Sequence, residues 1–206
     1  MRLILGHIAK IIYKDKFLYL QKQLLDEYSK VSKSDFADLD TLSKLLISGE
    51  DHRFFYHIGF DIIAIARAIK NRLLHDKIEG ASTIEQQLVR VLTNDYERTF
   101  RRKIREILLA TTLVSVIPKR AIPNIYLNVA YFGAGMTGLQ QTFNKLKISK
   151  ADKISLDDAA SIISRIKYPQ PNKESSKRLT QIEMRKQHLI FLYNKHQNRK
   201  YIKVYG

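Results

Sequence analysis

The sequence predicts a mainly α-helical protein, and three observations support this. Apolar residues recur at every third or fourth position, as Phe17, Leu20, Leu24 and Tyr28 do, and this spacing places them on one face of a helix. The alternation of apolar and polar residues that marks a half-buried strand is rare. The chain has 206 residues, 45% of them hydrophobic, which is enough to bury a sizeable core in one domain or in two lobes.

The segment before this helix does not meet the requirements for a membrane span. Met1–Tyr13 is apolar but is interrupted by Arg2, His7 and Lys10, whereas a transmembrane helix needs about 20 predominantly apolar residues. No small-residue cleavage pattern follows it, so it does not resemble a signal peptide either. We expect this segment to lie on a membrane without spanning it, or to accompany an anchor outside these 206 residues.

The remaining helices are predicted in chain order. Leu42, Leu45 and Leu46 mark a short helix that delivers Glu50 at its end. The next segment, Asp61–Leu74, is apolar nearly all round and is expected to be a buried helix capped by Asp61. Further helices are expected at 99–116, 119–129, 156–166 and 179–193, with a glycine-rich turn at 133–138.

The net charge is strongly positive. It amounts to +16, from 36 Lys and Arg against 20 Asp and Glu. Such a surplus implies an anionic partner, which can be a nucleic acid, an anionic membrane surface or a phosphorylated substrate. The chain has no cysteine, which excludes disulfides and thiolate metal sites.

A first polar cluster surrounds Glu50. This acid is followed by Asp51, His52, Arg53 and His57, interleaved with Phe54, Phe55, Tyr56 and Phe60. A carboxylate among aromatic rings is poorly solvated, which suits it to accept a proton. The alternative interpretation is the ordinary end of a helix at Gly49, followed by a loop.

A second cluster marks the start of another helix. Ser82 and Glu85 have the spacing of a capping box, in which Ser82 accepts from the first-turn amides and Glu85 reaches back. That motif leaves Gln86, Gln87 and Arg90 without an explanation. A helix N-terminus with hydroxyl and amide side chains is a good seat for an anion.

The third cluster is a basic run closed by one acid. It contains Arg98, Arg101, Arg102, Lys103 and Arg105, and it ends at Glu106. If the run is helical, Arg98, Arg102 and Glu106 share one face at four-residue spacing, which predicts a paired and ionised Glu106. The alternative is a solvated basic surface, the usual outcome of such a run.

These clusters resemble, in the same order, the sequence boxes of the peptidoglycan glycosyltransferases, glycosyltransferase family 51. The first box, Glu-Asp-x-x-Phe-x-x-His-x-Gly-x-Asp, is matched by Glu50, Asp51, Phe54, His57, Gly59 and Asp61. The second, Gly-x-Ser-Thr-Ile-x-Gln-Gln, is matched by Gly80, Ser82, Thr83, Ile84, Gln86 and Gln87. The third, Arg-Lys-x-x-Glu, is matched by Arg102, Lys103 and Glu106. The fourth, Ile-x-x-x-Tyr-Leu-Asn-x-x-Tyr-Phe-Gly, is matched by Ile122, Tyr126, Leu127, Asn128, Tyr131, Phe132 and Gly133.

The resemblance implies the bilobal, lysozyme-like fold of that family, with a smaller flexible lobe beside a long cleft. It also implies the family's reaction, which polymerises lipid II into glycan strands by an inverting mechanism and releases undecaprenyl pyrophosphate. By the same resemblance Glu50 is the catalytic base. Glu106 is the second catalytic acid, which organises the pyrophosphate region directly or through a divalent cation, Mg²⁺ or Mn²⁺. No organic cofactor is implied, and no metal ligands are assigned.

The residues expected to bind substrate come from the same boxes and their neighbourhood. They are Asp51, His57, Arg67, Ser82, Thr83, Gln86, Gln87, Arg90, Arg98, Arg102, Lys103, Arg105 and Asn128. Arginine suits phosphate because its guanidinium can bind two oxygens at once. Arg90 departs from the family, which prefers lysine at this position.

We expect a helical, membrane-proximal segment at 1–40, a catalytic core at 41–172 and a basic helical tail of the same domain at 173–206. The resemblance places the protein peripherally on the bacterial cytoplasmic membrane, with its active site on the outer face. Its expected partners are lipid II, the growing glycan chain, the anionic membrane surface and other cell-wall synthesis proteins, and no nucleic acid. Two alternatives stay open. A lysozyme-like, peptidoglycan-cleaving enzyme needs no basic cluster, and a non-enzymatic nucleic-acid-binding module needs neither acid.

Overall fold

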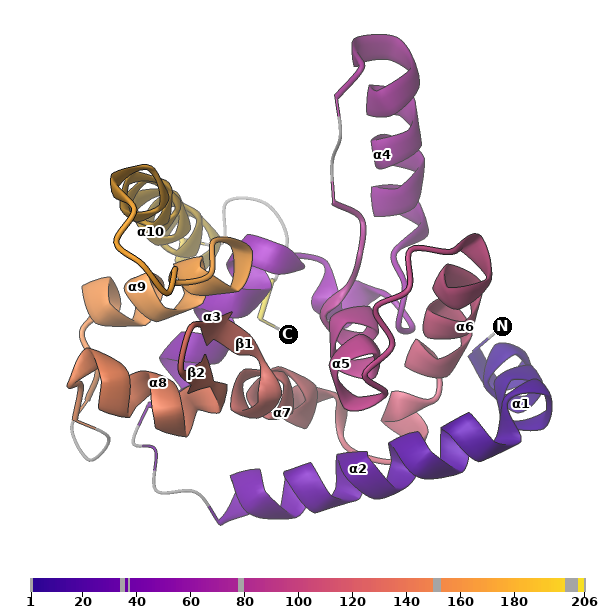
Figure 1. Cartoon of the computed structure of the whole chain (residues 1–206). Coiled ribbons are helices and arrows are strands. Elements are labelled where there is room, and N and C mark those ends of the chain that lie inside the picture. The colour runs from indigo at the N-terminus through magenta and orange to yellow at the C-terminus, as the bar shows by residue number, and fades with distance from the viewer. Residues whose placement is uncertain are drawn as a thin grey trace. The chain divides into compact units, whose positions relative to one another are not determined.

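The computed structural model describes residues 2–33, 36, 38–77, 80–149, 153–198 and 204–205. The chain divides into two compact units, and each unit is formed by two separate stretches of the sequence. The first unit contains Met1–Leu25 and Arg53–Ile122, and the second contains Asp26–His52 and Pro123–Gly206. Helices make up most of the described chain (Figure 1), which confirms the mainly α fold. The expected boundaries at residues 40 and 172 stay a prediction.

The first unit is built from short helices around an aliphatic core. Its elements are α1 (Arg2–Ile12), the first part of α2 (Lys14–Ser32), α4 (Ile62–His75), α5 (Ile84–Leu92) and α6 (Phe100–Ala110), with single 3-10 turns at Phe54–Tyr56, Leu113–Ser115 and Lys119–Ala121. Helix α6 packs against both α5 and α1. Ile84 and Leu88 of α5 and Leu109 of α6 are almost completely buried, as the apolar stripe of an amphipathic helix requires.

The second unit surrounds the end of α3. Its elements are α3 (Leu39–Glu50), α7 (Ile122–Val129), the strands β1 (Tyr131–Gly133) and β2 (Met136–Thr137), α8 (Gly138–Leu146), α9 (Leu156–Lys167) and α10 (Ser176–Gln197). The two strands pair antiparallel, with Tyr131 opposite Thr137. Helices α3, α9 and α10 pack against one another, and Leu45, Ile162 and Leu189 are buried in this unit. This three-helix packing fixes the position at which α3 ends.

Helix α4 corrects the prediction of a buried helix over Asp61–Leu74. The Asp61 side chain does cap it, by accepting from the amides of Ile63 and Ala64. However, no residue of α4 is buried, and Leu73 is 78% exposed. Figure 1 shows α4 standing away from the other helices of its unit. An all-round apolar helix needs an apolar environment, which the described part of the first unit does not supply.

Two helix boundaries and one additional helix also differ from the prediction. The capping box is wrong, because Thr83 and not Ser82 caps α5 by accepting from the amide of Gln86. Helix α6 ends at Ala110 and not near 116, since the hydroxyls of Thr111 and Thr112 donate back to carbonyls of the last turn. Around the glycine-rich turn the chain forms β1, β2 and then α8, a helix that the sequence did not predict.

Gly59 occupies a backbone position that no other residue fits. Its φ is +114°, a backbone conformation that residues with a side chain rarely adopt. A Cβ atom added there would lie 2.6 Å from the carbonyl oxygen of Ala110. The carbonyl of Gly59 in turn accepts from the Thr83 hydroxyl over 2.8 Å. Gly59 therefore fixes the loop of the first box against the end of α6 and the start of α5.

We predict that Gly59→Ala destabilises the protein by roughly 2–4 kcal/mol, because backbone strain adds to a clash with main-chain atoms. Gly80→Ala is the matched control, since a Cβ atom there meets nothing within 4 Å. Chemical denaturation of both variants measures the difference. Equal stability of the two variants would contradict this description of the loop.

Candidate active site

The side chains of α5 and α6 converge on Glu106, which is only 3% exposed. Arg90 makes a two-point contact, from Nε to Glu106 Oε2 over 2.9 Å and from Nη2 to Oε1 over 3.1 Å. Arg102 also donates to Oε2, and Lys103 Nζ donates to Oε1 over 2.7 Å. We call Glu106, Arg90, Arg102 and Lys103 the Glu106 cluster. The predicted pairing of Glu106 is confirmed.

The start of α6 decides which basic residues reach Glu106. Thr99 caps the helix by accepting from the amide of Arg102 over 3.1 Å, and Arg102 then lies one turn before Glu106. Arg98 precedes this cap and is exposed. Arg98 would share the face of Arg102 and Glu106 only if it were helical, and this condition is not met because the helix begins at Phe100.

The N-terminus of α5 extends the cluster with uncharged polar groups. Lys103 Nζ donates to Ser82 Oγ over 2.9 Å and also to Gln86 Oε1. Gln86 is fully buried, and its Nε2 donates to the carbonyl of Gly59 over 3.5 Å. The Thr83 hydroxyl donates to the same carbonyl over 2.8 Å. The second sequence box thus contacts the third box through Lys103 and the first box through Gly59. These contacts join the second and third boxes to the part of the first box that follows Arg53, all within the first unit.

The Glu106 cluster carries a surplus of positive charge. Three cationic side chains against one carboxylate leave a formal 3 − 1 = +2. Burial by itself raises the pKa of Glu106, but the hydrogen bonds from Arg90 and Lys103 outweigh burial, so this pKa lies below its ordinary value. Burial lowers the pKa of Lys103, and its contact with Glu106 offsets this only in part. The cluster is therefore an ionised acid among cations, and its net charge favours an anionic ligand.

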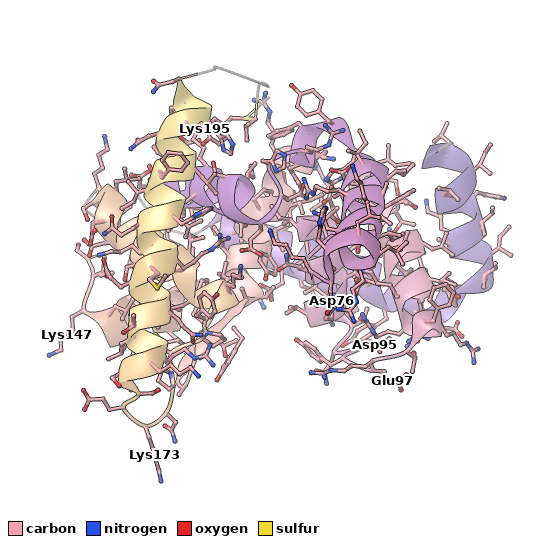
Figure 2. All side chains as sticks on the ribbon, turned by 90° about the horizontal axis from the view of Figure 1, so that it is seen from above. Asp76, Asp95, Glu97, Lys147, Lys173 and Lys195 are labelled. Carbon is pink, nitrogen blue, oxygen red and sulfur yellow. The ribbon has the colours of Figure 1, made fainter. Side chains whose placement is uncertain are left out.

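A polar pocket of about 490 Å³ adjoins the cluster. Its lining includes the basic side chains Lys16, Arg101, Arg102 and Arg105. Arg105 pairs with Asp95, and Lys16 Nζ lies 3.6 Å from the same carboxylate. Figure 2 labels Asp95 and Glu97, the two acids of the loop that leads into α6. The volume falls within the range of small-molecule sites.

The donors around Glu106 do not fit a divalent cation. Both carboxylate oxygens accept hydrogen bonds from cationic side chains. Mg²⁺ and Mn²⁺ bind through carboxylate and water oxygens, so an ion here would have to displace these side chains against their own positive charge. We therefore assign no step of the chemistry to a metal at this position.

Glu50 is the last residue of α3, and its carboxylate is paired with an arginine. Arg185 of α10 donates from Nη2 to Glu50 Oε1 over 2.9 Å and to the carbonyl of Gly49 over 2.7 Å. The side chains of Glu50 and Arg185 are 17% and 10% exposed. The helix ends here because Asp51 leaves the helical conformation while its amide still bonds to the carbonyl of Ile47. The prediction that α3 delivers Glu50 at its end is confirmed.

The other predicted binding residues lie in varied surroundings. Asp51 is buried at the end of α3. The His57 side chain is also buried, and its Nδ1 accepts from the amide of Gly59 over 3.3 Å. Asn128 donates to Glu27 of α2 over 2.7 Å within the second unit, a contact between α7 and α2.

The structure brings five predicted residues together at Glu106, namely Ser82, Gln86, Arg90, Arg102 and Lys103. Thr83 adjoins this group as the cap of α5, and Gln87 is half-buried on the same helix. Arg67 is exposed on α4. Like Arg98, Arg67 lies outside the Glu106 cluster.

Sequence reasoning missed two ion pairs. The fully buried Glu85 lies 3.1 Å from Lys119 Nζ, which also donates to the carbonyl of His57 over 2.5 Å. The other missed residue is Arg185, the partner of Glu50. Lys119 and Arg185 are distant in sequence from their acidic partners, so helical spacing could not predict either ion pair. For Arg185, the signal in the sequence was the basic composition of the C-terminal tail.

The comparisons with known proteins agree with the four boxes. The sequence profile of the family described as Transglycosylase matches residues 21–192. The chain is 34% identical to penicillin-binding protein 1A of Aquifex aeolicus over 144 residues, which are 68% of this chain and 20% of that protein. It is 32% identical to the biosynthetic peptidoglycan transglycosylase of Citrobacter koseri over 151 residues, 71% of this chain and 62% of that protein. It is 34% identical to the monofunctional glycosyltransferase of Staphylococcus aureus over 125 residues, 58% of this chain and 46% of that protein.

The chain thus spans about a fifth of the penicillin-binding protein and less than two thirds of each of the other two relatives. The family profile, by contrast, covers most of this chain and includes Glu50, the Glu106 cluster and Arg185. The chain belongs to the transglycosylase family, the peptidoglycan glycosyltransferases of glycosyltransferase family 51.

Proposed function

We propose that this protein is a peptidoglycan glycosyltransferase that polymerises lipid II into glycan strands. In this reaction the 4-hydroxyl of the acceptor sugar attacks the anomeric carbon of the growing chain with inversion. The bond to undecaprenyl pyrophosphate breaks, and its electron pair leaves with the pyrophosphate. Glu50 takes the proton of the attacking hydroxyl. Because pyrophosphate departs as an anion, no carboxylic acid has to protonate it, unlike in glycoside hydrolysis.

The observation that carries this proposal is the surplus charge of the Glu106 cluster. Negative charge develops on the leaving diphosphate, and fixed cations in a partly buried site stabilise such charge more strongly than water does. Arg90, Arg102 and Lys103 are already held in place by Glu106, so their ordering is complete before substrate binds. Ser82 and Gln86 add polar groups beside Lys103. The cluster fits a diphosphate better than it fits a neutral glycan.

The lysozyme-like alternative is less well supported. A hydrolase of that kind uses a carboxylic acid that is protonated before the bond breaks. The pKa of Glu106 is lowered by its cationic neighbours despite burial, so Glu106 does not supply such a proton. A hydrolase with its acid at the end of α3 has no need of the three cations around Glu106. The names of the relatives from Citrobacter koseri and Staphylococcus aureus also refer to transglycosylation and glycosyl transfer.

We further propose that the protein binds an anionic membrane surface, where a lipid-linked substrate resides. None of the helices described is long and apolar enough to cross a bilayer. The first unit does expose large apolar side chains on three of its helices: Leu3, Ile4, Ile11 and Ile12 of α1, Ile62, Ile63, Ile69, Leu73 and Leu74 of α4, and Phe100 of α6. Together with the net charge of +16, these side chains suit a peripheral, charge-assisted contact.

Replacement of Glu50 by Gln tests the base. We expect Glu50→Gln to lower the rate of lipid II polymerisation by about 100-fold or more, since it removes the proton acceptor and little volume. Glu183→Gln makes the same chemical change at an exposed position of α10 and should leave the rate unchanged. Labelled lipid II, purified glycan and a DNA duplex are offered in parallel. Near-wild-type polymerisation by Glu50→Gln contradicts the assignment, and shortening of the glycan favours the hydrolase.

Glu106 makes a stability contribution that depends on pH. Its pKa is lowered in the folded protein, so the stabilisation is complete above the ordinary Glu pKa of about 4.3 and is lost as pH falls through the folded-state value. Glu106→Gln should cost about 3–5 kcal/mol at pH 7, because it leaves cations without their buried partner. The gap to wild type should narrow toward about pH 3 in denaturant titrations.

The exposed Glu97 provides the control, since Glu97→Gln removes the same charge from the loop before α6. A pH-independent gap for Glu106→Gln would show that the ionised carboxylate is not what stabilises the cluster. We also expect the folded fraction of Glu106→Gln to lose polymerisation. Full activity in that fraction would make Glu106 a purely structural residue.

Vesicle sedimentation tests the membrane contact. Binding should require anionic lipid and weaken as salt rises, because each Lys or Arg near the surface contributes about 1 kcal/mol that salt screens. The double variant Leu73→Asn/Leu74→Asn should weaken binding at fixed salt by removing apolar area from α4. Met184→Gln, at an exposed position of α10, is the control. Failure of the wild type to bind at low salt would overturn the proposal.

A further inference from the structure

We infer that Arg185 is a positioning residue for the proposed reaction, which holds the Glu50 carboxylate in one orientation at the end of α3. The inference rests on the proposed function, in which Glu50 is the base. It assigns a role to the C-terminal helix α10, which none of the four sequence boxes includes.

The contact geometry ties one guanidinium nitrogen to two consecutive residues. Arg185 Nη2 lies 2.9 Å from Glu50 Oε1 and 2.7 Å from the carbonyl oxygen of Gly49. The carbonyl contact fixes Nη2 relative to the α3 backbone, and the carboxylate contact then fixes the Glu50 side chain relative to Nη2. A flexible side chain at a helix end is thereby held in one orientation, as general-base catalysis requires.

Gly49 provides the space for this contact. A Cβ atom at position 49 would lie 2.2 Å from Leu189 Cδ2 and 3.0 Å from Arg185 Nη2. Any larger residue would therefore have to displace the Leu189 side chain or the guanidinium from the end of α3. Gly49 lies inside α3 and has no left-handed backbone conformation. Close approach, and not a helix stop, accounts for glycine at this position.

The burial of Arg185 is unfavourable unless the contact with Glu50 compensates for it. The side chain is 10% exposed, and its Nε is buried without a hydrogen-bond partner among the described residues. A buried guanidinium with an unsatisfied donor contributes little to the stability of the fold. Its Nη2 contacts the carbonyl oxygen of Gly49 and the carboxylate of Glu50. This concentration of contacts at the base favours a positioning role over a general packing role.

The experiment compares Arg185→Met, Arg185→Lys and wild type in lipid II polymerisation. We expect Arg185→Met to lower kcat by about tenfold or more with little change in KM. Arg185→Lys should restore part of kcat, since it keeps the charge but not the shape of the guanidinium. Lys177→Met removes one charge from an exposed position of the same helix and should change neither quantity.

The outcomes separate this inference from the proposed function. If the folded wild type does not polymerise lipid II, or if Glu50→Gln remains active, the proposed function fails and the inference falls with it. If Glu50→Gln is inactive but Arg185→Met keeps the wild-type kcat, only the inference is overturned. A lower kcat that matches the unfolded fraction overturns it equally. Should Arg185→Met not fold, the kcat and KM of Arg185→Lys decide in the same way.

Discussion

The pairing of the buried Glu106 carboxylate is the interaction on which most of the first unit depends. An ionised carboxylate that leaves water is costly unless charge and hydrogen bonds replace its hydration. Arg90, Arg102 and Lys103 supply both. Lys103 then carries the network to Gln86, whose amide reaches the loop of the first box. Because one acid is shared among three cations, the interaction that holds α5 and α6 together also leaves positive charge for an anionic ligand.

The two glutamates illustrate how surroundings give one residue type two roles. Around Glu106 the cations outnumber the acid, so the group as a whole attracts a diphosphate. At Glu50 the guanidinium of Arg185 contacts the carboxylate and holds it in place. In the proposed reaction the first arrangement stabilises the leaving group and the second orients the base. The residue Arg90, where the family prefers lysine, makes the two-point contact with Glu106 that a lysine could not make.

Much of the site could be predicted because its residues are close in sequence. Lys103 and Glu106, and the polar start of α5, follow from helical spacing and from the four boxes. Contacts between distant segments could not be predicted in this way: Arg185 reaches Glu50 across 135 positions and Lys119 reaches Glu85 from another element. Helix periodicity predicted α4 but not its exposure, because an apolar pattern identifies a helix and not what covers it. Arg98 was misplaced because a single residue, Thr99, decides where α6 begins.

The central claim is that the surplus charge of the Glu106 cluster binds a diphosphate. Calorimetric titration of the wild type, Arg90→Lys and Arg90→Ala with inorganic pyrophosphate tests it most directly. We expect binding that weakens as salt rises, substantial binding by Arg90→Lys, and a loss of roughly 1.5–3 kcal/mol in Arg90→Ala, the range for hydrogen bonds to charged groups. Equal affinity of all three proteins, with Arg90→Ala as stable as wild type, would contradict the claim and make Arg90 a solvated surface residue.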